Sequence, residues 1–139
     1  RYNGYTDALK NYSDTTSVIF LEESLHGDKL KTARRLFTKK IITSLPDVII
    51  TSNDLIAQGI ISAAHENGIN IPNDMQITGF DDLLSSAYFI PSVTTVSQNI
   101  DKLAKRCFSM LMDLINKKSA VSSIIEQNII SRSSAKINI

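Results

Sequence analysis

The sequence predicts an α/β protein with three layers, in which helices cover both faces of a mainly parallel β-sheet. Short apolar segments alternate with amphipathic segments of roughly 10 to 16 residues, an order typical of βαβ units. The short segments are continuously apolar, as expected of parallel strands that are buried on both faces. With 139 residues and 42% apolar content, the chain is long enough to bury the core of one ordinary domain.

The first part of the chain contains two predicted strands, each next to a helix. Residues 3–11 are compatible with a short helix, and "SVIFL" at 17–21 is a β-branched and aromatic run typical of a strand. Apolar residues fall on one face of a predicted helix at 29–44, which Pro46 ends because the residue before proline avoids the helical conformation. "DVIIT" at 47–51 is the second predicted strand.

The middle of the chain repeats this alternation. "SND" supplies three good N-cap residues for a helix that runs to about Asn67, and Gly68 and Pro72 then stand where a helix ends. The apolar runs at 76–80 and 93–97 predict two further strands.

The clearest helical periodicity of the chain lies at 100–116, and a closing strand is expected at 123–131. Cys107 lies on the apolar face of that helix, so we expect it to be a small core residue. It is the only cysteine, so no internal disulfide is possible, which fits a reducing compartment.

Composition and spacing disfavour several classes of protein. A net charge of +1 predicts no strong attraction to nucleic acid or anionic membranes, and no run of 18 apolar residues could cross a bilayer. His26, His65 and Cys107 lack metal-ligand spacing, and neither glycine-rich phosphate motif is present, so we expect no metal and no cofactor. The chain starts without Met and without a signal-peptide apolar region, and we expect it to be a fragment.

Short polar side chains follow the predicted strands at their carboxyl ends. In open parallel α/β sheets, ligands bind in the crevice outside these ends. Carboxylates and amides match sugar hydroxyls well, because a carboxylate accepts hydrogen bonds and an amide both accepts and donates them. The residues in question are Glu22, Glu23, Ser24, Ser52, Asn53, Asp54, Asp81, Asp82, Ser97 and Gln98.

Four segments resemble the lactose-repressor/galactose-repressor family (LacI/GalR) of bacterial transcription regulators. They are "RYNGYTDAL", "PDVIITSNDLIAQGIISAAHENGIN", "IPNDMQITGFDD" and "FIPSVTTVSQ", in matching order over the whole chain. The resemblance implies a periplasmic-binding-protein-like fold with the second lobe and an incomplete first lobe. It implies a second lobe at 1–98, a first-lobe helix at 99–118, and a strand returning to the second lobe with a tail at 119–139. The DNA-binding headpiece of the family is absent from this chain.

The resemblance also implies roles for particular residues. It places Arg1, Asn53, Asp81, Gln98 and Leu25 at the effector. It places Gln58, Tyr88 and Phe89 at a homodimer interface.

Simpler structural roles remain open for the same residues. Asn53 could act only as the N-cap of the following helix, and Gln98 could form only a hinge hydrogen bond. Core packing is the alternative for Tyr88 and Phe89, and we expect Asp82 to form a turn or to cap the helix that follows it.

The expected function is that of a cytoplasmic regulator, most simply a repressor, of a sugar-utilisation operon. The resemblance implies a small-molecule effector, with sugars such as ribose or maltose as candidates, and operator DNA bound through the missing headpiece. A periplasmic sugar receptor is the alternative. An enzyme is disfavoured, because the adjacent Asp81 and Asp82 would point to opposite sides of an extended segment and would not converge on one substrate atom.

Overall fold

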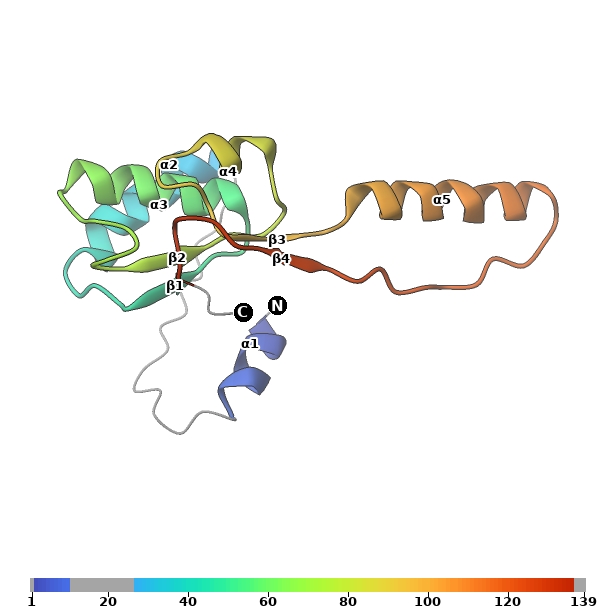
Figure 1. The fold of residues 1–139 in the computed structure, drawn as a ribbon, viewed down its shortest axis with the longest axis horizontal. Coiled ribbons are helices and arrows are strands. Elements are labelled where there is room, and N and C mark those ends of the chain that lie inside the picture. The colour runs from blue at the N-terminus through green and yellow to red at the C-terminus, as the bar shows by residue number, and fades with distance from the viewer. Residues whose placement is uncertain (1, 11–26, 137–139) are drawn as a thin grey trace.

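The computed structural model describes residues 2–10 and 27–136 of the chain (Figure 1). The predicted strand at 17–21 therefore lies outside the described residues. The observed elements are α1 (Tyr2–Leu9), α2 (Lys29–Leu36), the π-helical η1 (Phe37–Ile41), β1 (Val48–Ile50), α3 (Asp54–Glu66), β2 (Gln76–Thr78), α4 (Leu84–Tyr88), β3 (Thr95–Ser97), α5 (Ile100–Ile115) and β4 (Asn128–Ile130).

The central strands are parallel, as the alternation of helices and strands predicts. β1 pairs with β2 in parallel, with Ile49 opposite Ile77. Isolated parallel bridges continue this order to the segment of β3, where Thr78 faces Thr94 and Asp81 faces Ser97. β4 then pairs with β3 in the antiparallel direction. The α/β class with a mainly parallel sheet is confirmed.

Helices α2, α3 and α4 cover one side of this sheet, whereas α1 stands apart on the other side (Figure 1). The predicted apolar stripe of α3 is buried throughout, together with Ala33 and Phe37 of the preceding helical segment. Helices α2 and α3 approach closely at Gly59, where an added Cβ would lie 2.5 Å from the carbonyl oxygen of Leu30. An ion pair of 2.7 Å between Arg34 and Glu66 joins the same helices at the surface.

The prediction that strand 47–51 is buried on both faces is wrong for this chain. Val48 and Ile50 are 47% and 58% exposed, whereas Ile49 between them is half-buried. Among the described residues β1 pairs only with β2, and the exposed Val48 and Ile50 side chains lie on the same face of the strand.

Helix α5 projects from the rest of the molecule, to which β3 and β4 connect it (Figure 1). Its observed bounds agree with the predicted 100–116, but none of its residues is buried. The expectation that Cys107 is a core residue is therefore wrong here, since the thiol is exposed with the rest of the apolar face. Periodicity predicted the helix correctly but could not say whether the partner surface is present.

The chain beyond β4 returns to the sheet and fills a gap between two parallel segments. Ser134 is fully buried, and its hydroxyl donates to the carbonyl of Ile77 at 2.7 Å while it accepts from the amide of Thr94 at 2.8 Å. The amide of Ile77 donates to the carbonyl of Ser134 at 2.9 Å. The predicted strand at 123–131 is shorter than expected, because only residues 128–130 pair as a strand.

Candidate effector site

The carboxyl ends of three neighbouring parallel segments meet at one edge of the sheet. After β1, the hydroxyl of Thr51 donates to the carbonyl of Thr78 on β2 at 2.9 Å, and the amide of Asp54 donates to the carbonyl of Phe80. After β2, the amide of Asp81 donates to the carbonyl of Val96 on β3 at 3.0 Å. Asn53, Asp81 and Gln98 therefore lie at adjacent strand ends, as the sequence predicted.

Asn53 is the N-cap of α3. Its side-chain oxygen accepts from the amide of Ile56 at 3.0 Å, so the simpler role that the sequence left open is confirmed. The side chain is half-buried, and within the described ranges its Nδ2 group donates no hydrogen bond. Capping fixes the side chain and leaves the amide donor for another partner.

Asp81 and Gln98 contact each other directly. The Nε2 of Gln98 donates to Oδ1 of Asp81 at 2.6 Å, and both side chains are half-buried. Asp81 has φ of 121°, a left-handed value that a non-glycine residue rarely adopts. Within the part of the chain that the structure describes, Oδ2 of Asp81 accepts no hydrogen bond. A held carboxylate with one open oxygen is suited to accept hydrogen bonds from a ligand.

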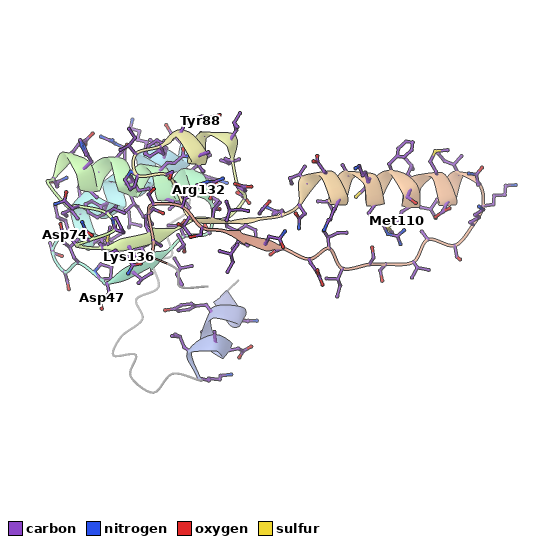
Figure 2. The ribbon with its side chains drawn as sticks, viewed as in Figure 1. Asp47, Asp74, Tyr88, Met110, Arg132 and Lys136 are labelled. Atoms are coloured by element: carbon purple, nitrogen blue, oxygen red, sulfur yellow. The ribbon has the colours of Figure 1, made fainter. Side chains whose placement is uncertain are left out.

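Of the two roles predicted for Asp82, a turn or a helix cap, the cap is wrong. Leu83 is the N-cap residue of α4 and makes no side-chain capping bond. Asp82 also has a left-handed φ, of 56°, and its Oδ1 accepts from the guanidinium of Arg132 at 2.6 Å. This arginine lies in the segment that follows β4, where the chain passes the loop before α4 (Figure 2). The adjacent acids thus have separate partners and do not share one atom.

Asp54 organises the site by joining three elements, whereas the sequence predicted it as a strand-end acceptor or a possible cap. Its side chain is fully buried and accepts three hydrogen bonds of 2.6–2.8 Å, from the amide of Leu83 and the hydroxyls of Ser86 and Thr95. These bonds connect the start of α3 to α4 and to β3. Gly79 makes room for the carboxylate, because an added Cβ would lie 2.1 Å from Oδ1 of Asp54.

The sequence also did not predict the contacts that Arg132 and Ser134 make with this part of the fold. Both belong to the polar "SRSSAK" stretch, which resembles an ordinary exposed tail in the sequence. The one signal was a lone arginine after a strand, and its acidic partner lies 50 residues earlier in the chain. Local sequence patterns cannot predict a contact between residues so far apart in the chain.

The residues predicted at a dimer interface lie on or beside α4. Tyr88 is 79% exposed, together with Leu84 at 78% and Ile90 at 85%. Phe89 is half-buried and packs against the core. Gln58 is buried, and its Nε2 donates to Ser85 at 2.9 Å and to Ser86 at 3.1 Å, so it holds α4 on α3.

Two of the predicted effector residues, Arg1 and Leu25, lie outside the described residues. Among residues 2–10 and 27–136, no group of His, Cys, Asp and Glu side chains could hold a metal ion. No helix in these ranges is long and apolar enough to cross a membrane.

Comparison with known proteins gives a consistent family. The model of the periplasmic binding protein-like domain matches residues 1–135. The transcriptional repressor PurR of Haemophilus influenzae (strain ATCC 51907) is 31% identical over 120 residues, covering 85% of this chain and 35% of that protein. The chain spans between 24% and 37% of the length of the curated relatives it matches.

Solved structures give the same result. The ribose operon repressor of Lactobacillus acidophilus is 28% identical, with a TM-score of 0.83, and the match covers 98% of this chain and 50% of that one. A LacI transcriptional regulator of Alkaliphilus metalliredigens in complex with D-xylulofuranose is 25% identical, with a TM-score of 0.76, over 96% and 50% of the two chains. The curated relative is a transcriptional repressor. The chain belongs to the periplasmic binding protein-like domain family and corresponds to part of the effector-binding domain of LacI-family regulators.

Proposed function

We propose that the full-length protein is a cytoplasmic LacI-type repressor whose effector is a small sugar or a related metabolite. The observation that carries this proposal is the hydrogen-bonded pair of Asp81 and Gln98, which lies with the N-cap residue Asn53 at the carboxyl ends of neighbouring parallel strands. The names of two related structures, a ribose operon repressor and a complex with D-xylulofuranose, support a sugar.

The chemistry of these three side chains suits a polyhydroxylated ligand. Oδ2 of Asp81 can accept from a sugar hydroxyl, and Nδ2 of Asn53 can donate to a sugar oxygen. Gln98 neutralises none of the carboxylate charge but fixes its orientation, so the acceptor is placed before the ligand arrives. Preorganisation of this kind lowers the entropic cost of binding.

The regulatory mechanism follows from a cleft between two lobes. In our proposal the partner lobe contacts α5 and supplies the rest of the effector site, so binding favours one arrangement of the lobes over the other. The exposed apolar residues of α4 pair two copies as a homodimer. Lobe closure then changes the relative position of two DNA-binding headpieces, and effector and operator affinities are coupled reciprocally.

A thermal-shift assay of the full-length protein tests the effector class. D-Ribose, D-xylulose and maltose are titrated against the wild type, Asp81→Asn, and Asp47→Asn as the matched control. Asp47 is exposed and precedes β1, at the end of the strand away from the site (Figure 2). We expect one sugar to raise the melting temperature of the wild type and of Asp47→Asn, because a ligand that binds only the folded state stabilises it.

We expect Asp81→Asn to weaken the binding of that sugar by about tenfold or more, because the substitution removes a charged acceptor. A sugar that binds the wild type and Asp81→Asn equally well would show that the effector site lies elsewhere. Absence of a shift with all three sugars would contradict the sugar class.

A further inference from the structure

Two consecutive aspartates in the left-handed region are held from two different segments of the chain. Asp81 has φ of 121° and Asp82 has φ of 56°, and neither is a glycine. Such backbone conformations are unfavourable for residues with a Cβ, and they persist where the surroundings hold them in place. The question is what holds this pair.

Side-chain contacts to the pair come from the two segments that connect the lobe to α5. Gln98, which precedes α5, donates to Asp81, and Arg132, which follows β4, donates to Asp82 at 2.6 Å. Backbone bonds complete the restraint, because the amides of Asp81, Asp82 and Leu83 donate to Val96, Thr95 and Asp54.

Arg132 is itself fixed by the sheet. Its Nη1 donates to the carbonyl of Val93 at 2.9 Å, and its backbone amide donates to the hydroxyl of Thr94 at 2.9 Å. The Arg132 and Asp82 side chains are only 18% and 26% exposed, so water screens this ion pair less than a pair on the surface. A rigid cation therefore holds the residue next to the proposed effector acceptor.

We propose that Arg132 is a positioning residue for the effector: through Asp82 it keeps the backbone left-handed and thereby holds the carboxylate of Asp81 in its binding orientation. The inference rests on the proposed function, because it concerns the same acceptor. It also makes the return segment after β4 part of the binding apparatus, although Arg132 need not touch the ligand. Any displacement of that segment alters the acceptor.

The first test measures backbone hydrogen exchange of the full-length protein without ligand. Arg132→Gln is expected to increase exchange in a peptide covering residues 80–84 and to leave the buried α3 peptide around Ile60 and Ile61 protected as in the wild type. Arg34→Gln is the matched control, since it breaks an ion pair of similar length between α2 and α3. Unchanged exchange at 80–84 in Arg132→Gln would overturn the inference.

The second test separates the backbone effect from the charge. Glycine adopts positive φ readily, so Asp82→Gly can keep the left-handed backbone without the ion pair to Arg132. Asp82→Ala also lacks this ion pair, but alanine disfavours positive φ. With D-ribose as the probe in calorimetry, we expect Asp82→Ala and Arg132→Gln each to bind about tenfold more weakly than the wild type. We expect Asp82→Gly to bind within about threefold of the wild type, and to bind equally well with or without Arg132→Gln.

The outcomes distinguish this inference from the proposed function. If Asp81→Asn weakens D-ribose binding but Arg132→Gln and Asp82→Ala do not, the proposed effector site is supported and the positioning role of Arg132 is wrong. If Asp82→Gly loses as much affinity as Asp82→Ala, the charge and not the backbone is what Arg132 supports, and the inference fails. If D-ribose does not bind the wild type, the exchange experiment alone decides whether Arg132 holds the turn.

Discussion

Single residues at the strand ends are fixed by close packing as well as by hydrogen bonds. Gly79 illustrates this, because its Cα lies against the carboxylate of Asp54, which is fully buried and held by three donors. A side chain at position 79 would clash with the Asp54 carboxylate, which cannot move without losing one of its hydrogen-bond donors. The glycine of the "TGFDD" motif is therefore needed for space, while its backbone conformation is an ordinary one.

We predict that Gly79→Ala lowers the free energy of unfolding by about 2 kcal/mol, because the new methyl group overpacks the site. Chemical denaturation of the full-length protein measures this change. Gly4→Ala is the control, since nothing lies within 4 Å of a Cβ added there. Equal unfolding midpoints for Gly79→Ala and the wild type would show that the loop after β2 can shift to accommodate a side chain.

At the scale of elements, local sequence signals located the helices and strands well. The "SND" motif predicted the start of α3, and Asn53 does cap it, because an N-cap needs only a side chain three residues from its partner amide. Apolar periodicity likewise predicted α5 within one residue. The carboxyl-end rule for parallel strands brought Asp81 and Gln98 to the same edge of the sheet.

The contacts that sequence reasoning missed connect residues far apart along the chain. Arg132 meets Asp82 across 50 residues, and Thr95 meets Asp54 across 41. Burial was the other failure: Cys107 and the exposed face of β1 depend on which partner surfaces are present, which a stripe of apolar residues does not state.

The exposed apolar face of helix α5 leads to a prediction about the full-length protein. Phe108 is 66% exposed on the apolar face of the helix, with Leu111 and Ile115 nearby on the same face. If this face packs in the first lobe, Phe108→Ala in the full-length protein leaves a cavity and lowers the free energy of unfolding by about 3 kcal/mol.

Denaturant unfolding of the full-length protein checks this, with Lys102→Ala as a control on the polar side of α5, where we expect less than about 0.5 kcal/mol. A loss for Phe108→Ala no larger than that of Lys102→Ala would mean that the face stays exposed, and the assignment of residues 99–118 to the first lobe would be withdrawn.

For the whole molecule, the exposed apolar surface on α4 has the character of a contact between copies. Leu84 and Tyr88 are four residues apart, on one face of α4, and both are nearly 80% exposed. The helix beneath them is held by Gln58 and Asp54, so the surface is rigid before it meets a partner. A rigid apolar patch of this kind suits the homodimer interface that we propose.

We predict that Tyr88→Glu weakens the homodimer by at least about thirtyfold, because it places a charge in an apolar interface. Sedimentation of the full-length protein across a concentration series measures the dissociation constant. Ser44→Glu adds the same charge at an exposed position outside α4 and is expected to leave the dissociation constant unchanged. If both variants stay dimeric like the wild type, α4 is not the interface.

The insertion of Ser134 beside Ile77 also constrains how the protein is made. These two residues are 57 positions apart, and the hydroxyl that joins the parallel segments arrives late during translation. Until residue 134 has left the ribosome, the amides of Ile77 and Thr94 lack their final partners. Helices α2 and α3 can pair early, but the sheet is complete only after Ser134 has been synthesised. A product truncated before Ser134 would therefore be a substrate for chaperones and proteases.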